Sequence, residues 1–397
     1  MLRYNSFYIL LFLAIGFFTL NLNYIEGDDA STIMYHALGR NLEIQPPYSS
    51  YHSMFDKVMS TITTTNERPL RIFAILISFI SGLVSLLLIA KIIKRKIPNE
   101  NLHLFLFLIP FIIPEILFSS LLINPTNLSI SFILGSHLLF IRYLESQKKS
   151  FLIYSLLLFG LGVSFRWIAA YYIFVLLGEY IIPKLGSIRN IFQKKTILQG
   201  ALIFGSYTVS LFLFIQLSGF SIFDILDTYN SGVSYIEKME TSYLAIFSGA
   251  LSYLTPALII FLLLGLFILI RKKNYSLLLL FVFSLIPYTV TGIFPFYKYM
   301  IVTIVPLLII AYYGCSFLKS KSRLFIYILI FSPWLFGFQI SSNSSWGPGF
   351  EIKNKNIKND NYSNFNPDNN TALKQTTVVL GTGTALPTPE GPRPLYG

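Results

Sequence analysis

Residues 70–90 read LRIFAILISFISGLVSLLLIA, a run long enough to cross the hydrocarbon core of a membrane as one helix. A span of this kind needs about 20 predominantly apolar residues. Ten other runs have the same character, which gives eleven expected spans: 7–25, 70–90, 102–122, 126–143, 151–165, 167–183, 197–217, 244–270, 275–294, 299–318 and 324–341. The sequence therefore predicts an all-α, polytopic bundle of transmembrane helices.

The composition supports a multi-pass membrane protein. Hydrophobic residues make up 54% of the 397 residues and charged residues 12%, about half the charged share of an ordinary soluble domain. The spans 151–165 and 167–183 are short and share Phe165-Arg166-Trp167 as their hinge, so they could instead form one broken or re-entrant hairpin. The first run follows Arg3 and lacks a small-x-small cleavage pattern, which predicts an uncleaved signal anchor.

Basic residues predict the orientation, because Lys and Arg of short loops collect on the cytoplasmic side. With the N-terminus inside, every second connection is basic, and Glu100, Glu145 and Glu179 are the only acids expected there. The bundle is thus predicted to run N-in and C-out. The net charge of +12 then reflects topology and contact with anionic lipids. Nucleic acid is an improbable partner, because the positive groups sit in short loops.

Three segments expected outside are long enough to hold chemistry: the loop 26–69, the loop 218–243 and the tail 342–397. We expect a transmembrane domain over 1–341, with short amphipathic helices in its outer loops. The tail is rich in Asn, Ser, Gly, Lys and Pro, a composition that cannot bury a core. It is expected to be mostly disordered, with at most one strand at Thr376–Leu380.

The first outer loop opens with an acidic pair, Asp28 and Asp29, in the stretch YIEGDDASTIMYHALGRN. A carboxylate inside the hydrocarbon costs on the order of 2.5–3.5 kcal/mol, so the pair should face water or a polar site. It could simply cap a helix that begins at Ala30, where free backbone N–H groups attract negative charge. His36 follows on the same predicted helix and is either a polar surface residue or a partner of Asp29.

Five stretches together resemble a known family: 26–41 (EGDDASTIMYHALGRN), 67–78 (ERPLRIFAILIS), 123–146 (INPTNLSISFILGSHLLFIRYLES), 160–174 (GLGVSFRWIAAYYIF) and 294–314 (FPFYKYMIVTIVPLLIIAYYG). In their residue types and in their order along the chain, these stretches are similar to the GT-C superfamily of membrane glycosyltransferases, over roughly residues 1–320. The likeness is strongest to the branch of the protein mannosyltransferases and the lipid-A aminoarabinose transferases.

The resemblance implies an enzyme that moves a sugar from a polyprenyl-phosphate carrier to a hydroxyl of a protein, lipid or glycan on the outer face of the cell membrane. The attacking hydroxyl needs a general base, and the departing phosphate needs positive charge. Asp28 matches the position of the family's catalytic acid, and Asp29 matches its neighbour. Their order as base is left open.

The same resemblance gives two phosphate-binding candidates, Arg166 and Lys298, the second flanked by Tyr297 and Tyr299. Both cations could instead be interfacial anchors within an aromatic belt. Glu115, near the outer end of the third span, could support the site or form a structural ion pair. No HExxH motif or Cys cluster is present, so no cofactor or metal site is predicted, although a divalent metal is not excluded.

Two other functions fit a polytopic protein that handles lipid-linked sugars. A glycolipid flippase or transporter tends to carry charges near the membrane midplane, whereas the ionisable residues here were expected at the outer boundary. A polysaccharide polymerase or ligase usually places its working loop late in the chain, and this chain places its distinctive loop first. A scaffold that binds a partner through its tail is a third alternative.

Overall fold

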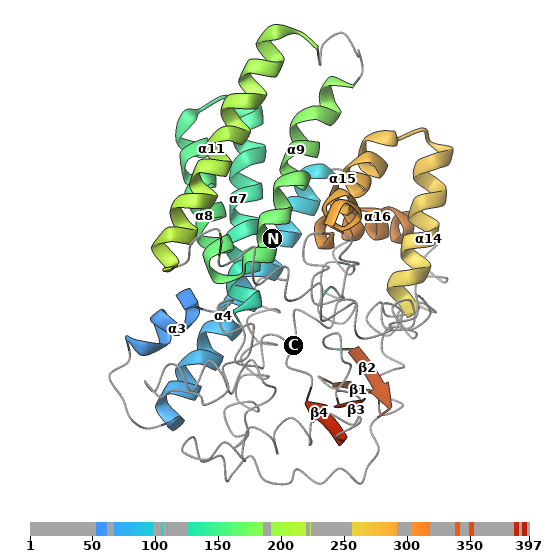
Figure 1. The fold of residues 1–397 in the computed structure, drawn as a ribbon. Helices are drawn as coiled ribbons and strands as arrows, with labels where there is room; N and C mark the ends of the chain where they lie inside the picture. The colour runs from blue at the N-terminus through green and yellow to red at the C-terminus, as the bar shows by residue number, and fades with distance from the viewer. Residues whose placement is uncertain are drawn as a thin grey trace.

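The computed structural model describes residues 53–61, 67–97, 105, 109, 125–185, 192–219, 223, 256–291 and 303–317, and four short strands after them. Its helices are α3 (Ser53–Ser60), α4 (Glu67–Lys96), α7 (Thr126–Ser146), α8 (Lys149–Phe165), η2 (Trp167–Tyr172), α9 (Ile173–Ile181), η3 (Ile182–Lys184), α11 (Lys194–Ser218), α14 (Pro256–Arg271), α15 (Tyr275–Thr291) and α16 (Ile304–Phe317). Figure 1 shows them as one helical bundle.

The predicted class of fold is confirmed, because every described segment up to residue 317 is helical. Four helical stretches are long and apolar enough to cross a membrane: Ile72–Lys96, Thr126–Ser146, Trp167–Lys184 and Lys194–Ser218. Helices α8, α14, α15 and α16 are apolar but shorter. The count of eleven spans stays a prediction, since the first and third expected spans lie outside the described residues, apart from Phe105 and Ile109.

The part of the tail that the structure describes forms two antiparallel hairpins, a difference from the sequence analysis. Strand β1 (Phe338–Ser341) pairs with β2 (Gly349–Ile352), and β3 (Ala385–Thr388) pairs with β4 (Gly391–Pro394). Strand β1 occupies the last four residues of the eleventh expected span, 324–341, and the rest of that expected span lies outside the described residues. The strand expected at Thr376–Leu380 lies outside the described residues.

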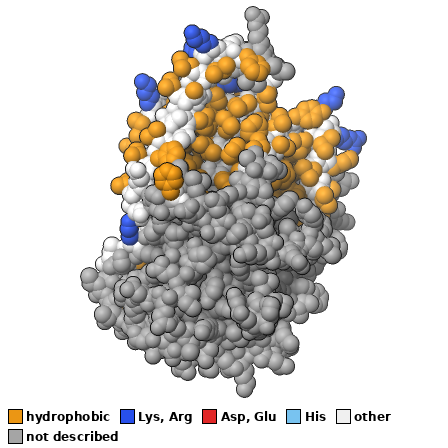
Figure 2. All heavy atoms as spheres, viewed as in Figure 1, with side chains coloured by type: hydrophobic (Ala, Val, Ile, Leu, Met, Phe, Trp, Pro, Cys, Tyr) orange, Lys and Arg blue, Asp and Glu red, His pale blue; other side chains and the backbone are white. Residues whose placement is uncertain are grey.

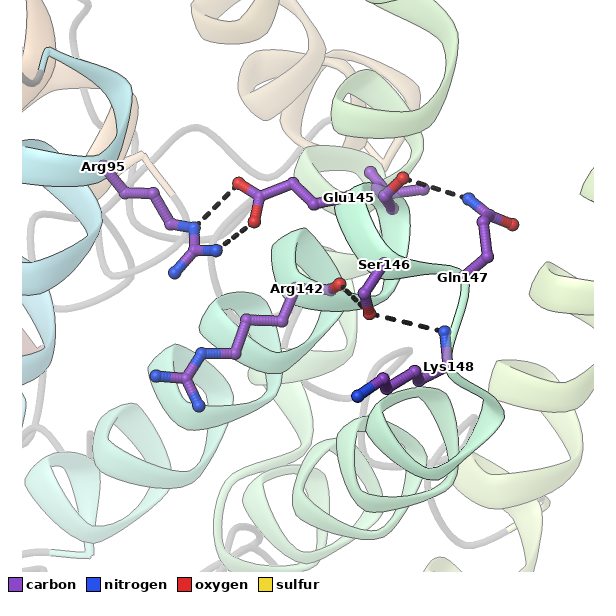
Figure 3. A network of polar contacts seen from close by, with 7 residues as sticks. Arg95, Arg142, Glu145, Ser146, Gln147 and Lys148 are labelled. Carbon is purple, nitrogen blue, oxygen red and sulfur yellow. Dashed lines mark hydrogen bonds and ion pairs between the residues drawn. The ribbon is translucent and has the colours of Figure 1, made fainter.

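The described connections that are rich in Lys and Arg gather at one end of the bundle, which we call the basic end. It includes the end of α4, the connection between α7 and α8, the end of η3 and the start of α11, with Lys94, Arg95, Lys96, Arg142, Lys148, Lys149, Lys184, Lys194 and Lys195. Arg95, near the end of α4, forms a two-point ion pair with Glu145 at the end of α7, with 2.8 Å between Arg95 Nε and Glu145 Oε1 (Figure 3). Tyr180 of α9 donates its hydroxyl to the carbonyl of Thr196 at the start of α11, at 2.8 Å. Helices α4, α7 and α9 therefore run towards the basic end, and α8 and α11 start from it.

An apolar surface covers the bundle below these cations. Figure 2 shows hydrophobic side chains over the visible helices, with most of the visible Lys and Arg side chains at their upper tips. Helix α11 carries much of this surface, and its exposed large hydrophobic residues are Ile197, Leu198, Leu202, Val209, Phe212, Leu213 and Leu217. This pattern fits helices that face lipid. The side of the membrane on which the basic end lies stays a prediction.

Small and hydroxyl-bearing residues let the helices approach closely. Ser136 of α7 and Ser155 of α8 exchange hydrogen bonds to each other's carbonyls at 2.8 and 2.7 Å, and Ser155 also meets the hydroxyl of Tyr207 on α11 at 2.6 Å. A Cβ added at Gly162 of α8 would lie 2.7 Å from Ile133 Cγ1. Without a hydrophobic drive between helices in lipid, such close packing and interhelical hydrogen bonds hold the bundle together.

Helix α3 is one of the short amphipathic helices expected in the outer loops, and it lies at the end opposite the basic end. Phe55 and Met59 are fully buried in a cluster with Leu70, Ala74 and Phe165. Lys57, on the other face, donates to the carbonyl of Ser218 at the end of α11, at 2.6 Å. Helix α3 thus packs on the bundle instead of lying free on the membrane surface.

Candidate functional site

The chain breaks its helical path at Arg166, where the sequence placed the hinge between two expected spans. Arg166 has extended backbone angles (φ −154°, ψ 105°) between α8 and the 3-10 helix η2. Its N–H still donates to the carbonyl of Gly162 at 3.2 Å, and its carbonyl accepts the N–H of Ala169 at 3.0 Å. One non-helical residue thus lets the chain turn back towards the basic end. Residues 151–165 and 167–183 are therefore two antiparallel helical segments joined at this residue, and their crossing of the membrane as two full spans stays a prediction.

The side chain of Arg166 is buried at this turn, with 6% of the residue exposed. Its Nη1 donates to the hydroxyl of Thr126, the first residue of α7. Ser129, one turn further along α7, donates to the carbonyl of Gly162 at 2.7 Å. The guanidinium is therefore fixed to the start of α7, at the end of the bundle that carries α3.

Positive charge from two sources meets at this place. The N-terminus of α7 presents the positive end of its helix dipole, and the residue before it, Pro125, supplies no side-chain cap. Arg166 adds a full charge next to the first residue of the same helix. A guanidinium beside a helix N-terminus is an arrangement suited to phosphate oxygens, since both sources favour negative charge and supply N–H donors.

Aromatic residues flank Arg166 on both sides. Phe165 stacks on Phe132 of α7, with 5.7 Å between ring centroids, and belongs to the apolar cluster under α3. Trp167 and Tyr171 of η2 meet edge to face at 6.2 Å. The aromatic belt that the sequence offered as the alternative role of Arg166 is thus partly present. The guanidinium itself nevertheless points to Thr126 inside the bundle.

Arg166 is the one predicted site residue that falls within the described part of the chain. The other seven lie outside it, and their roles stay predictions: Asp28, Asp29, His36, Glu115, Tyr297, Lys298 and Tyr299. Among the described residues, no group of three or more His, Cys, Asp or Glu side chains could hold a metal ion.

A second polar cluster, which the sequence analysis missed, lies inside the bundle towards the basic end. His137 of α7 places Nε2 3.0 Å from Glu179 Oε1 on α9, and Nδ1 2.9 Å from the hydroxyl of Tyr172 on η2. Lys96, at the end of α4, pairs with the second oxygen of Glu179. We call these four residues the histidine cluster. An ionisable residue within an apolar span, as His137 is in ILGSHLLF, was the available signal.

The histidine cluster corrects two expectations. Glu179 was counted among the acids of the cytoplasmic loops, but it is buried in α9, with 4% of the residue exposed, because Lys96 and His137 both bind its carboxylate. The expectation that ionisable residues gather at the outer boundary was likewise incomplete. The argument against a transporter that rested on it is correspondingly weaker.

Comparison with known proteins gives one match. Residues 46–215 match the model of the dolichyl-phosphate-mannose-protein mannosyltransferase family. No curated protein and no solved structure matches the chain. The match confirms the resemblance inferred from the sequence and supports a membrane glycosyltransferase of the GT-C type.

The matched segment runs from the residues just before α3 to near the end of α11. It therefore contains Arg166, the start of α7 and all four residues of the histidine cluster. Asp28, Asp29 and Lys298 lie outside it. Over residues 46–215, the chain is thus similar to the dolichyl-phosphate-mannose-protein mannosyltransferases.

Proposed function

We propose that this protein transfers a sugar from a polyprenyl-phosphate donor to an acceptor hydroxyl on the extracytoplasmic face of the cell membrane. In this proposal Arg166 holds the donor phosphate, with Lys298 as a second cation, and one carboxylate of the pair Asp28 and Asp29 is the general base. The observation that carries the proposal is the buried guanidinium of Arg166 at the start of α7, at the end of the bundle opposite the basic end.

The position of the basic end supports the outer face as the place of reaction. Lys and Arg in short connections mark the cytoplasmic side of a membrane protein. Arg166 lies at the opposite end, next to helix α3 and the end of α11. In this proposal, a site at that end binds a sugar carrier whose lipid tail lies in the outer leaflet.

The proposed chemistry needs few groups. The acceptor hydroxyl loses its proton to an Asp carboxylate as its oxygen attacks the anomeric carbon, and the bond between that carbon and the phosphate oxygen breaks. The bonding electrons stay on the departing phosphate, which needs cationic stabilisation and no proton. A guanidinium fixed before the substrate arrives supplies this without reorganising during the reaction.

The proposed role of Arg166 predicts a selective loss in donor use. Arg166→Ala should lower kcat/KM for a polyprenyl-phosphate sugar about 10- to 100-fold, since a hydrogen bond to a charged group contributes about 1.5–3 kcal/mol. The apparent KM for the acceptor should change little. Arg142→Ala is the matched control, because it removes an exposed guanidinium from the basic end. Equal donor kinetics in the two variants would make Arg166 an anchor only.

The proposed base predicts a loss of turnover without loss of protein. Asp28→Asn should abolish transfer while membrane insertion and abundance stay at the level of the unaltered protein, and Asp29→Asn is made beside it. Transfer of a radiolabelled sugar in purified membranes is the measurement. Full activity in both variants would remove the acidic pair from the mechanism.

A further inference from the structure

We infer that the histidine cluster is a positioning device, which fixes η2 along α7 and thereby sets where Arg166 meets the donor phosphate. The inference rests on the proposed function of Arg166. In this inference His137 and Tyr172 affect donor binding indirectly. They fix the position of η2 and do not contact the donor themselves.

The cluster connects four elements in one chain of polar contacts. Tyr172 is 1% exposed and His137 is completely buried, and they lie on η2 and α7. Glu179 extends the chain to α9, and Lys96 extends it to the end of α4. Such a network costs free energy to bury unless every member is satisfied, and when it is satisfied it specifies one arrangement of the elements.

The donors and acceptors form a consistent order. The carboxylate of Glu179 accepts from Lys96 on one oxygen and from His137 Nε2–H on the other. In the tautomer that carries its proton on Nε2, Nδ1 accepts the hydroxyl of Tyr172 at 2.9 Å.

Two contacts attach η2 to the same helix, one at each of its ends. Arg166, immediately before η2, binds Thr126 at the start of α7, and Tyr172, its last residue, binds His137. The stretch from Thr126 to His137 is about 16 Å of α-helix. The stretch from Arg166 to Tyr172 is about 12 Å at the rise of a 3-10 helix. These similar lengths allow η2 to lie along α7 with both ends held.

A 3-10 helix needs such support, because its hydrogen bonds are less favourable than those of an α-helix and runs of this length are uncommon. The backbone at Arg166 is extended, and its bond to the carbonyl of Gly162 is the last of the α-helical ladder of α8, so η2 does not continue that ladder. The hydrogen bond between Tyr172 and His137 attaches the far end of η2 to α7. Its loss should let η2 shift and move the guanidinium away from its place at the start of α7.

The test compares two substitutions of the same chemistry. Tyr172→Phe removes the hydroxyl that binds His137. Tyr207→Phe removes a hydroxyl from an equally buried tyrosine of α11, which binds Ser155 of α8. Both variants lose one buried hydrogen bond, so a general loss of stability should be similar in the two.

Two readouts are taken from the purified full-length proteins: hydrogen exchange of the backbone amides of residues 167–172, and the apparent KM for a polyprenyl-phosphate sugar. We expect faster exchange in Tyr172→Phe than in Tyr207→Phe. We also expect a donor KM raised about fivefold in Tyr172→Phe only, the factor that corresponds to one net hydrogen bond of about 1 kcal/mol. The acceptor KM should be unchanged in both.

Equal exchange of residues 167–172 in the two variants would overturn the inference, whatever the kinetics. Faster exchange with an unchanged donor KM would also overturn it. Arg166→Ala, measured beside them, separates this outcome from a failure of the proposed function. If Arg166→Ala raises the donor KM and Tyr172→Phe does not, only the positioning role fails; if neither raises it, Arg166 does not hold the donor.

Discussion

The contact between α14 and α16 gives a sharp prediction, because two glycines face each other across it. A Cβ added at Gly314 of α16 would overlap the carbonyl oxygen of Phe261 on α14 and lie 2.8 Å from the nitrogen of Gly265. The opposing atoms belong to the backbone of α14, which cannot rotate away as a side chain can. Gly314→Ala therefore requires the two helices to separate.

The distance by which α14 and α16 must move apart determines how much stability Gly314→Ala loses. Ordinary contact begins near 3.4 Å, so a distance of 2.8 Å to Gly265 must grow by about 0.6 Å, and the overlap with the Phe261 oxygen requires more. A gap of about 0.5–1 Å forfeits a quarter to a half of each dispersion contact along the seam. Overpacking of this kind typically costs about 1–3 kcal/mol, so we expect Gly314→Ala to destabilise the bundle by about 2 kcal/mol.

The matched control is Gly205→Ala on α11, where an added Cβ meets nothing within 4 Å. Alanine is the better helix former by about 1 kcal/mol, so this variant should be as stable as the original protein or more stable. The midpoint of unfolding by sodium dodecyl sulfate, in mixed micelles, measures both. The same chemical change should thus shift the midpoint in opposite directions. Equal midpoints would refute the close approach of α14 and α16.

Two ion pairs should differ in their contributions to stability, measured by the same titration. Lys96→Met should lower the free energy of unfolding by about 2–4 kcal/mol, because it leaves the carboxylate of Glu179 buried with one partner fewer. The double variant Lys96→Met with Glu179→Gln should recover part of this loss. A double variant less stable than Lys96→Met alone would contradict a buried pair. Arg95→Ala should lower the free energy of unfolding by less than about 1 kcal/mol, and by less still at high salt, since Arg95 and Glu145 keep 34% and 49% of their side chains exposed. A loss larger than that of Lys96→Met would contradict the expected difference between the two ion pairs.

The helical character and the positions of several spans could be predicted from the sequence, because lipid demands long apolar helices. The hinge at Phe165-Arg166-Trp167 was identified for the same reason, since Arg166 interrupts two apolar runs. The 3-10 form of η2 was not predicted. It depends on contacts with α7, more than twenty residues earlier in the chain, and no local pattern in WIAAYY encodes them.

The candidate site was predicted less completely than the fold. Arg166 was selected as a lone cation between apolar runs; the structure places it, buried, next to Thr126, and its role stays a prediction. The histidine cluster was missed because its members come from four separate elements, and each alone has an ordinary explanation. Lys96 and Glu179 look like loop charges by position, and only their pairing in space shows that Glu179 lies inside the bundle.

The place of the donor phosphate is the central claim, and a photoreactive polyprenyl-phosphate analogue tests it most directly. The reactive group is placed next to the phosphate, the protein is irradiated in membranes, and the labelled peptides are identified by mass spectrometry. We predict labels within residues 125–129 and 163–172, which unmodified donor displaces and Arg166→Ala removes. Displaceable label confined to the basic end, within 142–149 or 184–195, would contradict the account.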